Sequence, residues 1–203
     1  MDPNETAVGL IGYQNDYFAP DGVLRSAIEE SARVTDNLVN VVDFIERVRG
    51  TSILLVNTPI VFTADYTELV EPVGILKIVK EAGAFKAGTK GVETIPELRR
   101  FADRIIEVPG KRGLNAFSNT DLDTLFQKHA VSNVVLAGVV TSLCVDSTAR
   151  SAYERGYKVT ILADCTSGRT NFEQKFYCED IFPLYAEVID HAQLLRRLGV
   201  VDG

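Results

Sequence analysis

The chain has 203 residues, of which 46 % are hydrophobic and 24 % charged, the composition of a globular domain that can bury a full core without disulfide or metal staples. Its 21 Lys and Arg against 28 Asp and Glu residues give a net charge of −7 with no basic run, which argues against a nucleic-acid binder. No apolar stretch approaches the roughly 18 residues of a membrane span, and the polar N-terminus does not resemble a signal peptide. We therefore predict one cytoplasmic domain over residues 1–203, with neither nucleic acid nor membrane as partner.

Apolar runs alternate with segments of helical period along the chain, a pattern typical of βαβ units around a parallel sheet that is covered on both faces. The predicted strands are residues 7–11, 53–56, 104–108, 134–140, 159–163 and 186–189, and the predicted helices are 34–48, a short one opening at 94–97, 121–129, 144–155 and 192–198. Thr94 and Thr170 each precede a Glu by three residues, the spacing of a capping box. Residues 60–91 are the least regular part.

The cysteines and histidines predict neither disulfides nor a metal site. Cys144, Cys165 and Cys178 form an odd, sparse set, which indicates reduced cytosolic thiols. His129 and His191 lie far apart in the sequence, whereas a zinc site needs about four N or S ligands at short intervals. We therefore predict no metal and no cofactor.

Three segments directly follow predicted strands, at the edge where parallel sheets bind ligands. They are residues 12–18, 109–117 and 138–144, and each carries polar groups that a turn does not need. Cys144 ends the last of them, at the start of a predicted helix. Unpaired N–H groups there favour a thiolate and can hold an oxyanion. The residues alone leave a second reading open, in which Cys144 packs the strand–helix turn, and for Cys165 and Cys178 we favour that reading.

Lys111 follows a predicted strand and Pro109-Gly110. It is either a solvated surface lysine or a cation at the mouth of a pocket that favours a thiolate or polarises a carbonyl. For Phe117 we favour core packing, and for Asp16 a turn or helix cap.

These segments together resemble the isochorismatase-like cysteine hydrolases, a superfamily that includes nicotinamidases, N-carbamoylsarcosine amidases and ureidoacrylate amidohydrolases. The resemblance runs from about residue 7 to about residue 165. It rests on the run Val-Val-Leu-Ala-Gly-Val-Val-Thr-Ser-Leu-Cys-Val at 134–145, on the lysine segment 111–122, and on Gln14-Asn15-Asp16-Tyr17.

The resemblance implies a three-layer α/β/α sandwich, a homo-oligomer and a triad of Asp, Lys and Cys. Cys144 would attack a carboxamide to form a thioester, and Lys111 would stabilise charge near the thiolate. A cis peptide would join Val139 to Val140, and the backbone amides of Val140 and Cys144 would form the oxyanion hole. Other residues expected at the pocket are Tyr13, Asp16, Tyr17, Asn115, Phe117 and Thr141.

The sequence departs from the family pattern at Gly12, which stands where the family has its aspartate. The usual general base is therefore absent. Replacement carboxylates that the spacing leaves open are Asp65, Glu68, Glu71 and, more remotely, Glu173. The stretch 57–62 contains no histidine, which disfavours a nicotinamidase and its metal.

We therefore expect a cysteine hydrolase that cleaves a carboxamide or related C–N bond of a small molecule, with a non-standard or missing base and weak activity. The alternative is a catalytically impaired member that binds a small ligand, or a partner protein through residues 60–91. A lyase or isomerase that uses the thiolate is a third reading, with no feature in its favour.

Overall fold

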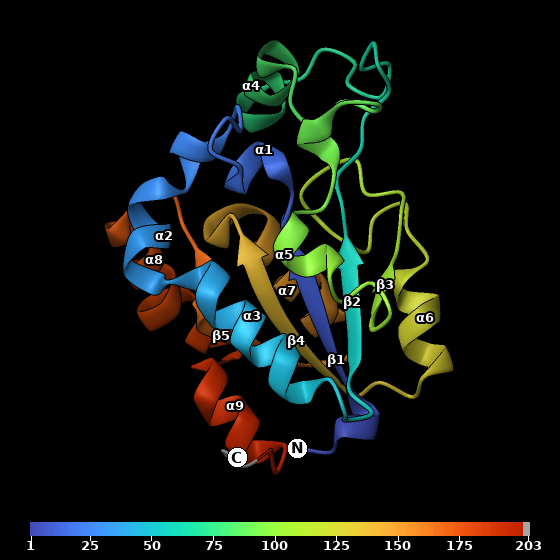
Figure 1. Cartoon of the computed structure of the whole chain (residues 1–203), viewed down its shortest axis with the longest axis vertical. Helices are drawn as coiled ribbons and strands as arrows, with labels where there is room; N and C mark the ends of the chain where they lie inside the picture. Colours follow the sequence, from blue (N-terminus) through green and yellow to red (C-terminus); the bar gives the residue numbers. More distant parts are fainter. Residues whose placement is uncertain (201–203) are drawn as a thin grey trace.

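The computed structural model describes residues 1–200. Six strands form one parallel sheet in the order β3-β2-β1-β4-β5-β6, with β1 and β4 at its centre (Figure 1). The strands are β1 (Thr6–Ile11), β2 (Leu54–Thr58), β3 (Ile105–Glu107), β4 (Asn133–Val139), β5 (Lys158–Ser167) and β6 (Glu187–Ile189).

Helices cover both faces of the sheet, which confirms the predicted three-layer α/β/α architecture (Figure 1). The helices are α1 (Asn15–Phe18), α2 (Glu29–Thr35), α3 (Asn37–Val48), α4 (Gly74–Ala82), α5 (Pro96–Arg99), α6 (Leu122–Lys128), α7 (Asp146–Glu154), α8 (Asn171–Phe176) and α9 (His191–Arg197). One apolar core lies between the sheet and α3, α5 and α9. The other lies on the opposite face, under α6 and α7. Within residues 1–200, no helix combines the length and apolar character that a membrane crossing requires.

All six predicted strands are present, displaced by a residue or two at their ends, and β5 runs on to Ser167. Four helices were not predicted: α1, α2, α4 and the whole of α8 beyond its cap. Of the two expected capping boxes, Thr170 does cap α8 by accepting from the Glu173 N–H. Thr94 caps nothing, because α5 begins at Pro96 and the Thr94 hydroxyl accepts from Asn57 instead. The reciprocal capping box is at Asp190, where α9 begins.

The chain beyond the carboxyl ends of β1 and β2 is held by three consecutive side chains, Gln14, Asn15 and Asp16. The Gln14 amide accepts from the backbone N–H of Ile60 and donates to two carbonyls of this segment, those of Ile60 (2.8 Å) and Val92 (2.7 Å). The Asn15 amide donates to the Lys90 carbonyl, and an Asp16 oxygen accepts from the Phe85 N–H at 2.6 Å. Residues 60–93 therefore lie over the same edge of the sheet as α1 (Figure 1).

Candidate active site

Cys144 lies in the turn that joins β4 to α7. The peptide bond between Val139 and Val140 is cis, as the resemblance implies. A single wide turn, Thr141–Val145, follows, and α7 begins directly after it. The Cys144 side chain is only 3 % exposed. The nucleophile candidate is therefore at the start of a helix, as predicted, and inside the protein.

Lys111 reaches the cysteine from the loop after β3. Its side chain is fully buried, and its Nζ donates to the Cys144 Sγ at 3.5 Å. Within residues 1–200, that sulfur is the one hydrogen-bond or ion-pair partner of the Lys111 amino group. Burial lowers the pKa of Lys111, because an ammonium loses its hydration there, while a charge on Cys144 acts in the opposite direction. Lys111 and Cys144 thus form an isolated buried pair.

The loop that carries Lys111 is tied to the helix that follows Cys144. The Ala116 N–H donates to the Thr148 hydroxyl of α7 at 3.0 Å, and the Thr120 hydroxyl donates to the Ala116 carbonyl. The lysine and the cysteine are 33 residues apart in the sequence, and these contacts fix their relative position.

Gly12 has little room for a side chain. Its φ is +72°, and a Cβ built on it would lie 2.7 Å from the Val139 carbonyl oxygen and 3.5 Å from Tyr17 Cε2. The space next to the backbone of Gly12 is therefore filled by the end of β4 and by the Tyr17 ring.

The acidic residues of this part of the chain are either bound to other groups or exposed. Glu68 accepts from Thr63 and pairs with Arg112, and Asp65 and Glu71 are exposed. Asp16 accepts from the Phe85 N–H, and burial raises its pKa despite that hydrogen bond. It acts as an anchor for the Phe85 segment.

Glu173 lies under the turn that carries Cys144. It accepts from the Ser142 hydroxyl and pairs with Arg169 at 2.6 Å. Its neighbour Gln174 accepts from the Thr141 hydroxyl at 2.6 Å and donates to the Ala163 carbonyl at 3.0 Å. Helix α8 thus supports the turn through two side chains. The Thr170 cap was its one signal in the sequence.

The remaining residues expected at the pocket are distributed between the two cores. The Tyr13 hydroxyl is 2.7 Å from Asn37 Oδ1, in the core under α3, on the other face of the sheet from Cys144. Phe117 packs edge-on against Phe126 and stacks on Tyr157, as expected for core packing. Asn115 accepts from the Phe117 N–H in a local turn.

Two buried side-chain oxygens within residues 1–200 lack a hydrogen-bond partner, and both are at the end of β2. They are Asn57 Oδ1 and Thr58 Oγ1. Thr58 pairs in register with Ile11, the residue before Gly12. Unpaired buried polar atoms are rare in native proteins, so these two oxygens are an unusual feature of this edge of the sheet.

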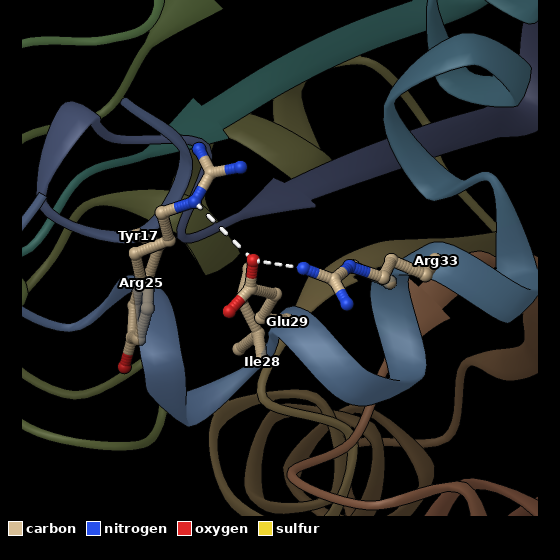
Figure 2. Close-up of a pocket in the computed structure, with 6 residues that line it drawn as sticks. Tyr17, Arg25, Ile28, Glu29 and Arg33 are labelled. Carbon is tan, nitrogen blue, oxygen red and sulfur yellow. Dashed lines mark hydrogen bonds and ion pairs between the residues drawn. The ribbon is translucent and has the colours of Figure 1, made fainter. Parts of the chain in front are cut away.

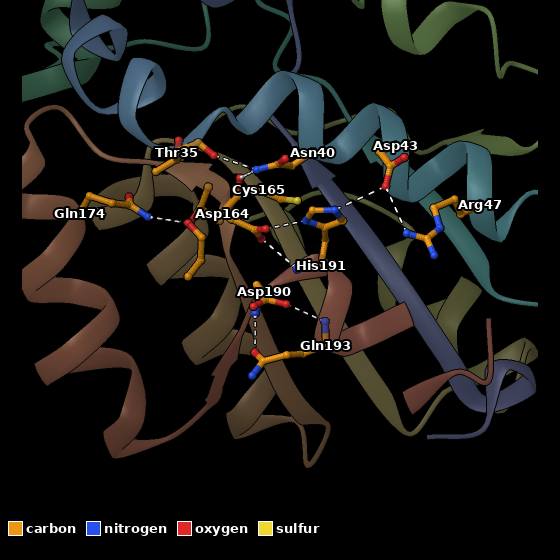
Figure 3. A network of polar contacts seen from close by, with 12 residues as sticks. Thr35, Asn40, Asp43, Arg47, Asp164, Cys165, Gln174, Asp190, His191 and Gln193 are labelled. Atoms are coloured by element: carbon orange, nitrogen blue, oxygen red, sulfur yellow. Dashed lines mark hydrogen bonds and ion pairs between the residues drawn. The ribbon is translucent and has the colours of Figure 1, made fainter. Parts of the chain in front are cut away.

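A second polar cluster is centred on His191, at the start of α9 (Figure 3). Ligand atoms of Asp164, Cys165 and His191 lie within 4.8 Å of one another, a proximity that the sequence spacing did not predict. His191 Nδ1 is 2.5 Å from Asp164 Oδ2, and its Nε2 is 3.4 Å from Asp43 Oδ2. Two ligands of one tetrahedral zinc would be about 3.4 Å apart given the usual bond lengths. The shorter distance fits a hydrogen bond that joins α9 to β5, with α3 on the other side of the ring.

Comparison with known proteins gives a consistent family assignment. The model of the isochorismatase domain matches residues 6–193. YddQ, an uncharacterised isochorismatase family protein of Bacillus subtilis, is 30 % identical over 171 residues, which cover 84 % of this chain and 82 % of the relative. The ureidoacrylate amidohydrolase RutB of Rhizobium rhizogenes is 25 % identical over 178 residues, covering 82 % and 72 %. A cysteine hydrolase structure from Pseudomonas syringae pv. phaseolicola superposes with a TM-score of 0.82 at 22 % identity, covering 98 % and 94 %, and shows the same fold.

Proposed function

Because this chain belongs to the isochorismatase family, and relatives within it are named for amide hydrolysis, we propose that it is a cysteine-dependent hydrolase of a small-molecule carboxamide or related C–N bond. The observation that carries the proposal is the 3.5 Å contact between Lys111 Nζ and Cys144 Sγ inside the protein. In this proposal the pair works without the aspartate of the family.

In this proposal Lys111 acts as the general base in place of the missing aspartate. Burial favours its neutral amine, and an amine next to a thiol can accept the thiol proton to give a thiolate and an ammonium. The Cys144 thiolate then attacks the amide carbonyl carbon, and a C–S bond forms. The tetrahedral intermediate collapses to a thioester when the C–N bond breaks, and the Lys111 ammonium gives its proton to the departing nitrogen.

Hydrolysis of the thioester returns the pair to its starting state. Lys111, now neutral, accepts a proton from water as the water oxygen attacks the thioester carbon. The C–S bond breaks, the carboxylic acid leaves, and Cys144 recovers its proton from Lys111. In both halves the backbone amides of Val140 and Cys144 are the proposed oxyanion donors, since groups aimed at the developing charge give the largest stabilisation in such sites.

The test is selective alkylation followed by turnover. We expect iodoacetamide at neutral pH to label Cys144 before Cys165 and Cys178, because burial raises the pKa of Cys165, and raises that of Cys178 to about 12 with help from Glu179. A panel of small carboxamides is then screened for ammonia release by the wild type and by Cys144→Ala.

Turnover that requires Cys144 supports the hydrolase. Labelling of Cys144 no faster than that of Cys178, together with no ammonia from any amide, refutes it. Ligand binding without turnover would instead favour the binding module that the sequence left open.

A further inference from the structure

Two neighbouring hydroxyls of the turn that carries Cys144 donate to two neighbouring side chains of α8. The Thr141 hydroxyl donates to Gln174 Oε1 at 2.6 Å, and the Ser142 hydroxyl donates to Glu173 Oε1 at 2.5 Å. The cis peptide bond comes directly before these two residues, and Cys144 follows them. One short helix therefore holds the turn between its cis peptide bond and its nucleophile.

Gln174 can accept from the turn in only one orientation of its amide. Its Nε2 donates to the Ala163 carbonyl and to the Thr166 hydroxyl, both at 3.0 Å. Here β5 bulges, because Ile161 and Thr166 pair with residues of β4 that are only two positions apart, and a bulge frees main-chain groups from the ladder. Since an amide donates from its nitrogen and accepts at its oxygen, these bonds turn Oε1 toward Thr141.

Glu173 provides a charged acceptor although its side chain is only 9 % exposed. One carboxylate oxygen pairs with Arg169 Nε at 2.6 Å, and the other accepts from the Arg169 backbone N–H at 3.2 Å. A carboxylate accepts hydrogen bonds and donates none, so the Ser142 hydroxyl proton is directed toward α8. A buried ion pair adds little net stability but can fix one geometry, which is what a nucleophile turn requires.

The start of α8 is fastened on its other side to α2. The Asn171 N–H donates to Glu30 Oε1 at 2.8 Å, and the Gly168 N–H donates to Ser31 Oγ at 3.1 Å. Glu29, the residue before Glu30, instead lines a pocket of about 190 Å³ and lies there between two arginines (Figure 2). Helix α8 is thus hydrogen-bonded both to α2 and to the turn that it holds.

We propose that Glu173 and Gln174 are positioning residues for Cys144. By binding the two hydroxyls they keep the turn where the sulfur lies 3.5 Å from Lys111 Nζ. A misplacement of about 1 Å can cost a reacting pair roughly a hundredfold in rate, so the contacts that fix this distance control reactivity. The inference rests on the proposed function for the reacting amide, whereas the reactivity of the Cys144 thiol is measured without any amide.

The test compares iodoacetamide labelling of Cys144 at neutral pH in the wild type, Ser142→Ala, Glu173→Leu and Glu173→Gln. We expect Ser142→Ala and Glu173→Leu to label about tenfold or more slowly than the wild type. Glu173→Gln keeps an acceptor for Ser142 and should restore most of the rate. The control is Ser132→Ala, which removes a serine hydroxyl from the Glu5 carboxylate (2.9 Å) at the far end of β4 and should label like the wild type.

The second contact is tested by Thr141→Val, which removes the hydroxyl bound by Gln174 and keeps the shape of the side chain. We expect Cys144 to label about tenfold or more slowly in this variant too. The matched control is Thr6→Val, because the buried Thr6 hydroxyl donates to the Asp2 carbonyl at 2.7 Å, away from the cysteine turn. Labelling of Thr141→Val at the rate of Thr6→Val would refute the role of Gln174.

A merely structural role predicts the opposite sign. Cys144 is 3 % exposed and Cys165 is fully buried, so a loosened fold exposes both thiols and speeds the labelling of each. Loss of positioning slows the labelling of Cys144 and leaves that of Cys165 unchanged. In a Lys111→Met protein, Ser142→Ala should have no further effect, because positioning acts through the distance to Lys111.

The outcomes separate this inference from the proposed function. If Ser142→Ala and Glu173→Leu label Cys144 at the wild-type rate or faster, or if Glu173→Gln restores nothing, the positioning role of Glu173 is refuted, even if the wild type hydrolyses amides. If labelling slows and Glu173→Gln restores it, but the wild type releases no ammonia from any carboxamide, the positioning role stands and the hydrolase is refuted.

Discussion

Replacing Gly12 by alanine tests whether the end of β4 occupies the space beside it. Two costs add at this position. An L-residue in the left-handed region costs roughly 1–2 kcal/mol, and Gly12 has φ +72°. A Cβ at 2.7 Å from the Val139 carbonyl oxygen overpacks a buried site, which costs typically about 1–3 kcal/mol. We expect Gly12→Ala to lower the free energy of unfolding by about 2–5 kcal/mol.

Two other glycines separate the two costs. Gly156 has φ +89° but nothing within 4 Å of the point where its Cβ would lie, so Gly156→Ala should lose only the roughly 1–2 kcal/mol of backbone strain. Gly50 has neither feature, so Gly50→Ala should be neutral or slightly stabilising. Urea unfolding of the three variants and the wild type, analysed by linear extrapolation, gives the comparison.

A Gly12→Ala protein that loses no more stability than Gly156→Ala would show that the carbonyl does not fill the site. Gly12→Asp extends the test to function. We expect it to be at least as destabilised as Gly12→Ala and to alkylate at Cys144 no faster than the wild type. A Gly12→Asp protein of wild-type stability with faster alkylation would show that the structure accepts a carboxylate at this position.

Three further changes have defined outcomes. Lys111→Met should slow iodoacetamide labelling of Cys144 by about tenfold or more while stability at neutral pH holds or rises, because a buried amine is replaced by an apolar chain; unchanged labelling would remove Lys111 from the mechanism. Burial raises the pKa of Asp16, so the folded protein favours the protonated carboxyl. The stability that this protonated carboxyl contributes is complete below the ordinary pKa of 3.8 and is lost as the pH rises through the raised pKa. Asp16→Asn should therefore gain stability relative to the wild type between about pH 4 and pH 7, and a gap in unfolding free energy that stays constant over that range would contradict this. Gln14→Ala removes three buried or half-buried hydrogen bonds and should cost about 2–4 kcal/mol, with faster proteolysis within residues 60–93 than in the wild type; intact protection there would show that the anchor lies elsewhere.

The parts of the fold with strong local signals were predictable. Apolar runs such as 134–140 are typical of buried strands in a parallel sheet, and turn residues fix where they end. Cys144 follows the most apolar predicted strand, and Lys111 follows another strand. Both therefore lie at the ligand-binding edge of the sheet, where the carboxyl ends of parallel strands meet.

What the sequence did not predict depends on contacts between distant segments. The Glu173 side chain supports the cysteine turn from 31 residues away, and His191 meets Asp164 across 27 residues. Neither contact has a periodicity or a spacing that marks it in the sequence. The sequence predicted a departure from the family pattern at Gly12, but it could not predict that the Val139 carbonyl lies 2.7 Å from the point where a Cβ at this position would be, which only the folded backbone defines.

The side chains of residues 14–16 hold residues 60–93 over the edge of the sheet by hydrogen bonds. All of these bonds go to main-chain atoms of that segment. Hydrogen bonds of this kind do not depend on the side chains of the segment they hold, except at Gly91, where a Cβ would lie 2.1 Å from an Asp16 oxygen. Substitutions at other positions of residues 60–91 can therefore leave the attachment points in place. The same property makes this segment a natural unit for grafting: a loop from a relative with another specificity should dock on the same three side chains.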